Sequence, residues 1–185
     1  MASIGSDYLV GLSAAHRWHD PELTAEAPPP IDVQIKRTRE LLTLADRLPS
    51  VEPARFRMQG FGYKADGKIV RACAAGWLPN LVPGTDLQHQ DEQYCGLRFG
   101  AADDCFSSLR LYFQLSTSEV LSLFGIHERT APEAAAVIGA FAETRMRQLD
   151  PSWRRAPIAK SAVRRAFDWL REAVAVRIPV PVRSR

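Results

Sequence analysis

The stretch Arg71-Ala-Cys-Ala-Ala-Gly-Trp77 decides how the middle of this chain folds. Its small residues favour a short, closely packed helix, which we expect over residues 73–78, with Pro79 as its end. Two helix-start signals follow, Ser116-Thr-Ser-Glu119 and Thr130-Ala-Pro-Glu133. In both, a hydroxyl and a carboxylate three positions later can cap the free N–H groups of a helix. We therefore expect helices after each signal, with Trp77 and Phe124 buried in one core.

Upstream of this stretch, the pattern predicts one long helix and a β-hairpin. Ile35, Leu41 and Leu48 share a helical stripe between Asp32, the expected N-cap, and the proline at position 49. We expect the charged residues of that helix to face solvent, namely Lys36, Arg37, Arg39, Glu40 and Arg47. The Asp66-Gly67 pair lies between two apolar segments and predicts a small β-hairpin near residues 56–70. Residues 79–100 carry prolines and glycines and are predicted to form the longest loop, a frequent place for function.

These elements predict a mainly α fold, a single-domain helical bundle of five or six helices with that one hairpin. Three prolines at positions 28–30 mark a boundary. We expect an N-terminal arm over residues 1–30, a helical core over 31–177 and an extended tail over 178–185. The last helix of the core is predicted to begin at Pro157.

Composition narrows the classes of protein to which the chain can belong. Of its 185 residues, 46% are hydrophobic and 24% are charged, which is typical of a globular domain. No apolar run is long enough for a membrane span, and the first residues do not resemble a secretory signal. Three cysteines without a Cys-x-x-Cys motif are typical of reduced thiols. We therefore expect a cytoplasmic protein with no membrane partner.

Five short motifs occur in a fixed order between residues 41 and 144: Arg55-Phe-Arg-Met58, Cys73-Ala-Ala-Gly-Trp77, Leu115-Ser116, Leu123-Phe124 and Thr130-Ala-Pro-Glu133. The series resembles a small group of uncharacterised bacterial and phage-associated proteins that carry a Cys-Gly-Thr-x-x-Cys-x-x-Gly-Trp/His block. The resemblance implies a shared helical fold and an origin in a mobile element, and it implies no activity. Lys68, Ile69 and Val70 stand where that block has its first cysteine, glycine and threonine. A metal or redox role that needs the cysteine pair is therefore not expected here.

Candidate chemistry is sparse. We interpret Cys73 as a buried, inert thiol, because free cysteine is among the most buried residue types. Two clusters could in principle bind a metal: His16 with His19 and Asp20, and His89 with Asp91, Glu92 and Cys95. Neither has a complete ligand pattern, so we predict no catalytic residues, no metal and no cofactor. An enzyme with an unrecognised site near Cys73 or His89 remains a third alternative.

The charge distribution is uneven, and this is the strongest electrostatic feature. The net charge is +3, but residues 86–144 carry 3 basic and 9 acidic side chains, whereas residues 145–185 carry 11 basic and 3 acidic ones. The basic end can meet an acidic protein, nucleic acid or the chain's own acidic middle. Its candidate binding residues are Arg154, Arg155, Lys160, Arg164 and Arg165. We interpret the chain as a non-enzymatic interaction module or regulator that binds another protein. A nucleic-acid-binding regulator that uses residues 145–171 is the alternative.

Overall fold

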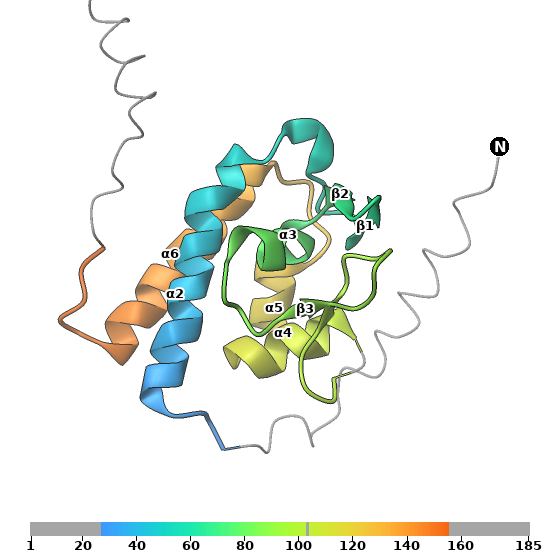
Figure 1. The fold of residues 1–185 in the computed structure, drawn as a ribbon. Coiled ribbons are helices and arrows are strands. Elements are labelled where there is room, and N and C mark those ends of the chain that lie inside the picture. Colours follow the sequence, from blue (N-terminus) through green and yellow to red (C-terminus); the bar gives the residue numbers. More distant parts are fainter. Residues whose placement is uncertain (1–26, 103, 156–185) are drawn as a thin grey trace, which may run out of the picture. The chain divides into compact units, whose positions relative to one another are not determined.

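The computed structural model describes residues 27–102 and 104–155. The chain divides after Trp153 into two compact units, and of the second only Arg154 and Arg155 are described. The described residues of the first unit are mainly helical, with five α-helices and a small antiparallel hairpin, as predicted (Figure 1). Most of the predicted N-terminal arm, the predicted last helix and the predicted tail lie outside the described residues. The elements run in the order α2 (Ile31–Arg47), β1 (Gly62–Ala65), β2 (Lys68–Ala72), α3 (Ala74–Leu81), β3 (Gln88–His89), β4 (Leu97–Arg98), α4 (Cys105–Phe113), α5 (Thr117–Phe124) and α6 (Ala131–Leu149), with short 3-10 turns at Leu48–Ser50 and Pro53–Arg55.

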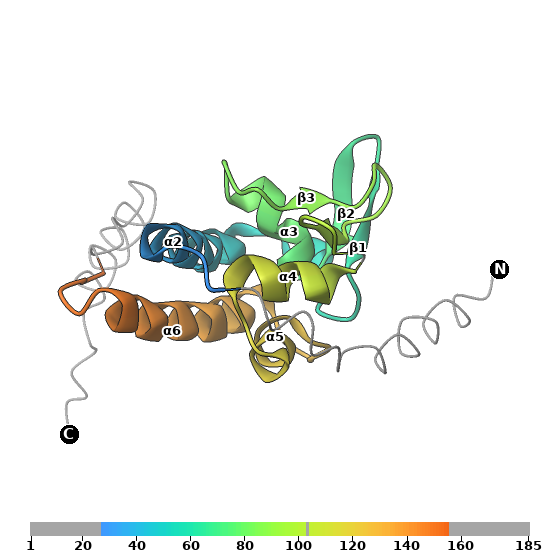
Figure 2. The ribbon, with the colours of Figure 1, turned by 90° about the horizontal axis from the view of Figure 1, so that it is seen from below.

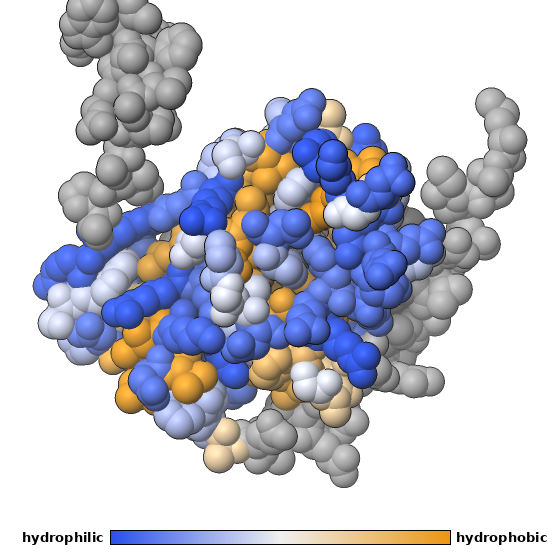
Figure 3. Space-filling model, viewed as in Figure 1, coloured by the Kyte–Doolittle hydropathy of each residue, from blue (hydrophilic) through white to orange (hydrophobic). Residues whose placement is uncertain are grey.

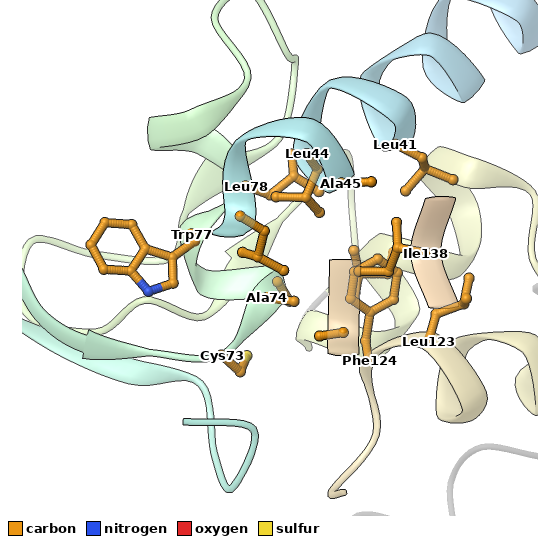
Figure 4. Close-up of a cluster of buried hydrophobic side chains, with 14 of the residues drawn as sticks. Leu41, Leu44, Ala45, Cys73, Ala74, Trp77, Leu78, Leu123, Phe124 and Ile138 are labelled. Atoms are coloured by element: carbon orange, nitrogen blue, oxygen red, sulfur yellow. The ribbon is translucent and has the colours of Figure 1, made fainter. Parts of the chain in front are cut away.

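Helices α2 and α6 lie side by side and run in opposite directions (Figures 1 and 2). Helix α2 contributes buried leucines, and α6 contributes mostly small residues, which allow the two backbones to approach closely. In Figure 4, Leu41 lies near Ile138 of α6, within the cluster of buried side chains that continues to α3 and α5. Burying one such leucine stabilises the fold by about 1.5–3 kcal/mol relative to leaving it exposed.

Both predicted capping boxes are confirmed. The Ser116 hydroxyl accepts from the Glu119 backbone N–H at 3.2 Å, and the Glu119 carboxylate accepts from the Ser116 N–H at 2.7 Å. Thr130 and Glu133 form the same reciprocal pair at the start of α6. These local bonds satisfy N–H groups that a helix leaves free at its first turn. They therefore fix where α5 and α6 begin.

The stretch from Arg71 to Trp77 joins β2 directly to α3. Cys73 is the N-cap residue of α3, and the Trp77 side chain is 8% exposed, so its predicted burial is confirmed. Phe124 is buried as well. The predicted end of the helix at Pro79 is wrong, because α3 continues to Leu81. Pro79 lacks one N–H donor, but the final turn still closes when the Val82 N–H donates to the Leu78 carbonyl at 2.9 Å.

Helix α2 differs from its prediction at two points. Its N-cap is Pro30, not Asp32, which lies in the first turn, where the helix dipole favours a negative charge. The predicted exposure of Glu40 is wrong, because that residue is 7% exposed. Arg37 is half-buried, and its guanidinium lies 4.4 Å from the centre of the Tyr112 ring. Both side chains face α4, a neighbour that the pattern of α2 alone does not reveal.

The hairpin spans residues 62–72, so it begins six residues after the start of the predicted segment and ends two residues after its end. Phe56 makes only an isolated bridge with Ala72, because the preceding residues form a 3-10 turn. Residues 79–100 do not form one long loop as predicted. They contain the end of α3 and the short antiparallel pairing of β3 with β4. Among the described helices, none combines the length and the apolar character needed to traverse a lipid bilayer.

Candidate partner-binding surface

The turn of the hairpin sets its register. Asp66 and Gly67 have φ angles of 50° and 71°, the left-handed pair that a two-residue type I′ turn requires. Ala65 then lies opposite Lys68. Because successive strand residues point to opposite faces, this register separates an inner face from an outer one.

The inner face is buried and the outer face is exposed. Ile69 lies on the inner face and is 2% exposed. On the outer face, Tyr63 lies opposite Arg71, and an isolated bridge sets Tyr94 opposite Tyr63 on its other side. Val70 is the unpaired residue of a bulge in β2. We call five exposed residues of this region the hairpin face: Tyr63, Lys68, Val70, Arg71 and Tyr94.

Three large apolar side chains of the hairpin face are exposed to solvent. Tyr63 is 51% exposed, Tyr94 is 55% exposed and Val70 is 38% exposed. Residues directly opposite each other on an antiparallel pair have their Cβ atoms about 5 Å apart, so the two tyrosines adjoin. Figure 3 shows that polar residues dominate the side of the molecule that it views, with apolar patches between them. Adjoining exposed tyrosines are typical of binding surfaces, because the ring is large and rigid and ends in a polar group.

Basic residues lie on the hairpin and next to it in the sequence. Five basic residues lie on or beside the hairpin, and none of them lies within ion-pairing distance of a carboxylate of the described residues. Two are held in place: Arg55 donates to the Ile69 carbonyl and lies 5.1 Å from the Trp77 ring centre. The Arg71 Nε donates to the Ala54 carbonyl at 3.1 Å. The region thus presents positive charge that the described part of the chain does not neutralise, from Arg55, Arg57, Lys64, Lys68 and Arg71.

Carboxylates lie beside Tyr94. The Asp91 Oδ1 atom accepts from the backbone N–H groups of Gln93 and Tyr94, at 2.7 and 2.6 Å, and this turn sets the tyrosine at the rim. Glu92 is exposed next to it. The hairpin is therefore mostly basic, with Asp66 at its turn as the one carboxylate of residues 62–72, and its edge at Tyr94 is acidic.

The three cysteines are buried and free. Burial raises the pKa of Cys73, raises that of Cys95 to about 11, and raises that of Cys105 well above its ordinary value. A thiol in this state is protonated at neutral pH and is a poor nucleophile. The prediction that Cys73 is a buried thiol is confirmed.

His89 has a structural contact. Its Nε2–H donates to the Gly76 carbonyl at 2.9 Å, which leaves the Nδ1 lone pair facing the Lys64 amine at 3.4 Å. Burial, with the nearby Lys64, lowers the pKa of His89, so the ring is neutral at pH 7. The neutral imidazole ties β3 to α3. Over residues 27–102 and 104–155, no three His, Cys, Asp or Glu side chains are grouped so that they could hold a metal ion.

The predicted basic binding residues are described only in part. Arg154 is exposed and Arg155 is half-buried. Lys160, Arg164 and Arg165 lie outside the described residues, as does the cluster of His16, His19 and Asp20. The basic end and the cluster of His16, His19 and Asp20 therefore stay predictions.

Sequence reasoning missed the hairpin face because its two tyrosines come from separate segments. Tyr63 lies in β1, and Tyr94 lies in the turn between β3 and β4. One signal was present. Tyr63 and Lys68 lie on either side of the Asp-Gly turn, and Lys68 directly precedes the buried Ile69, so these two neighbours point to opposite faces. No such signal exists for Tyr94.

Comparison with known proteins adds no relative: no family model, no curated protein and no solved structure is significantly similar to the chain. The resemblance to a phage-associated group therefore stays a prediction.

Proposed function

We propose that this chain is a non-enzymatic, cytoplasmic interaction protein that binds an acidic protein partner through the hairpin face. The observation that carries the proposal is the pair of adjoining exposed tyrosines, bordered by cations that have no carboxylate partner among the described residues. A partner that covers the tyrosines and supplies carboxylates would complete both features. We further propose that the protein originates from a phage or mobile element.

The mixed charge of the surface favours protein over nucleic acid. Asp91 and Glu92 lie next to Tyr94, where they would repel a phosphate backbone that stacked its bases on the ring. A protein partner can place a basic or neutral group there and acidic groups over Lys68 and Arg71. Tyrosines at the centre of an interface with charges at the rim are also the usual arrangement of protein–protein contacts.

The basic end is the second surface in this proposal. It comprises Arg154, Arg155, Lys160, Arg164 and Arg165, whose charge would increase the rate of association with an acidic partner. The alternative function, binding of nucleic acid by residues 145–171, requires those arginines and leaves the hairpin face uninvolved. Substitutions in the hairpin face and substitutions in residues 145–171 therefore distinguish the two functions.

Site-specific photocrosslinking in the native host tests the proposal. A photoreactive phenylalanine analogue replaces Tyr63 in one variant and Tyr94 in a second. In a control variant it replaces Ile126, an apolar residue that is 56% exposed after α5. We expect one protein species to crosslink at positions 63 and 94 and not at 126, and Lys68→Glu to reduce its yield.

Two results would overturn the proposal. If the same species crosslinks equally well at position 126, the contact is not specific to the hairpin face. If crosslinks at 63 and 94 are absent while nucleic acid co-purifies and is lost in the Arg154→Glu/Arg155→Glu variant, the alternative function holds.

A further inference from the structure

A second feature, apart from the hairpin face, is a buried carboxylate between α2 and α4. Glu40 is 7% exposed, and its Oε2 atom accepts from the Tyr112 hydroxyl at 2.8 Å. Its other oxygen, Oε1, is fully buried and has no hydrogen-bond donor. The Lys36 amine lies 3.9 Å from Oε1 but is closer to Asp86, at 3.2 Å. Glu40 is thus a desolvated acid with one good hydrogen bond and one distant cation.

The Tyr112 hydroxyl connects Glu40 to the segment of residues 85–87. It has one hydrogen and two carboxylates within reach: Glu40 Oε2 at 2.8 Å and Asp86 Oδ2 at 3.5 Å. The same oxygen accepts from the Asp86 backbone N–H at 3.3 Å and from the Thr85 hydroxyl at 3.4 Å. Because a hydroxyl hydrogen can point to only one acceptor, the shorter bond to Glu40 excludes the longer one to Asp86.

The charged groups around Glu40 set the balance between its two protonation states. Lys36 comes from α2 itself, Asp86 from the segment after α3, and Tyr112 from α4. Arg37 stacks on the Tyr112 ring and donates to the Tyr112 backbone carbonyl at 2.8 Å, so it holds the ring in place. Burial, with the negative charge of Asp86, raises the pKa of Glu40. Hydrogen bonding by Tyr112 and Thr85 and the charge of Lys36 oppose that shift.

We propose that Glu40 and Tyr112 form a pH-sensitive hydrogen-bond switch that sets how residues 85–87 are held against α2 and α4. Above its pKa, Glu40 is ionised and takes the Tyr112 hydrogen. When the pH falls below that pKa, Glu40 binds one proton from solvent and its new hydroxyl donates to the Tyr112 oxygen. The Tyr112 hydrogen then turns to the Asp86 carboxylate, which draws Asp86 toward α4 and loosens the Thr85 contact. No covalent bond changes apart from this one protonation.

The experiment is an NMR titration of the whole protein that follows the side-chain carboxyl carbons and the backbone amides. We expect Glu40 to titrate above the ordinary glutamate pKa. We also expect the amides of Asp86 and Leu87 to shift with the same midpoint. Glu40→Gln removes the titrating group, so the amide step at that midpoint should disappear. Tyr112→Phe should uncouple residues 85–87 from Glu40 and raise the Glu40 pKa further, because it removes the bond that favours the charged form.

The matched control is Glu52→Gln, which changes an exposed carboxylate before the 3-10 turn at Pro53 and should leave the amide step in place. Two results would overturn the switch. One is a Glu40 that titrates at or below the ordinary glutamate pKa. The other is a set of amide shifts at residues 85–87 that do not follow the Glu40 midpoint in the unmodified protein. Both come from the wild-type chain, so they decide the matter even if a variant fails to fold.

Discussion

Gly76→Ala adds one methyl group where α3 meets the hairpin, and we expect it to destabilise the protein. A Cβ atom at this position would lie 2.4 Å from the Phe61 carbonyl oxygen, 2.8 Å from the Ala72 Cβ and 3.0 Å from the Cys95 Cβ. All three distances are shorter than van der Waals contact. None of the three atoms is the flexible end of a long side chain, so backbone must move to relieve the overlap.

The magnitude follows from two opposing effects. Alanine is a better helix former than glycine, which would stabilise α3 by about 1 kcal/mol. Overpacking a tight site costs about 1–3 kcal/mol, and three simultaneous overlaps with backbone or Cβ atoms place Gly76 at the upper end of that range. We therefore expect a net loss of about 1–2 kcal/mol in the free energy of unfolding.

Urea denaturation followed by circular dichroism measures this loss. The control is Ala140→Gly on the exposed side of α6, which should lose about 1 kcal/mol from helix propensity alone. If Gly76→Ala is as stable as the unmodified protein, or more stable, helix propensity dominates. The close contact of α3 with the hairpin would then be refuted.

Three further predictions concern the core and its titratable groups. Trp77→Ala should lose about 3–5 kcal/mol in the free energy of unfolding, because it empties a large buried site; a loss below 1 kcal/mol would show that Trp77 is not in the core. The three thiols should react slowly with a thiol reagent in the native protein and quickly in denaturant, because they are buried and protonated; rapid native labelling of Cys73 would contradict this. Glu40→Gln should stabilise the protein by about 1 kcal/mol at pH 7, because it removes a buried charge with an oxygen that lacks a donor. The pKa of Glu40 is raised in the folded state. Between the ordinary glutamate pKa and the raised one, the folded state therefore keeps a proton that the unfolded state has released. The free energy of unfolding falls as the pH rises through that window. The extra stability of Glu40→Gln over the unmodified protein should therefore vanish at pH values below the ordinary glutamate pKa. If the difference in the free energy of unfolding between the two proteins does not change with pH, the pKa of Glu40 is not raised.

Features set by neighbouring residues could be predicted from the sequence. The two capping boxes and the Asp66-Gly67 turn depend on residues within three or four positions of each other, and all of them are confirmed. The burial of Trp77 follows from the small residues around it, which is also a local pattern. These signals were enough for the mainly helical class and for the first residues of α5 and α6.

Features set by residues distant in sequence could not be predicted. The pattern of α2 indicates which residues form its apolar stripe, but it does not indicate that Tyr112 of α4 supplies a hydrogen bond to Glu40. In the same way, the pairing of Tyr63 with Tyr94 depends on how residues 79–100 fold back onto β1. Both the buried acid and the candidate surface are tertiary features, so sequence reasoning ranked the basic end above them.

The most direct test of the central claim is a binding measurement. The partner identified by crosslinking is purified, and its affinity is measured for variants with single substitutions in the hairpin face. We expect Tyr63→Ala to weaken binding by about 2 kcal/mol, or roughly thirtyfold, since a central tyrosine is a frequent hot spot. Lys68→Glu should slow association most strongly at low salt. Ile126→Ala should change the affinity less than twofold, on the scale of a neutral surface substitution. If Tyr63→Ala and Lys68→Glu bind as tightly as the unmodified protein, the hairpin face does not bind the partner and the central claim is contradicted.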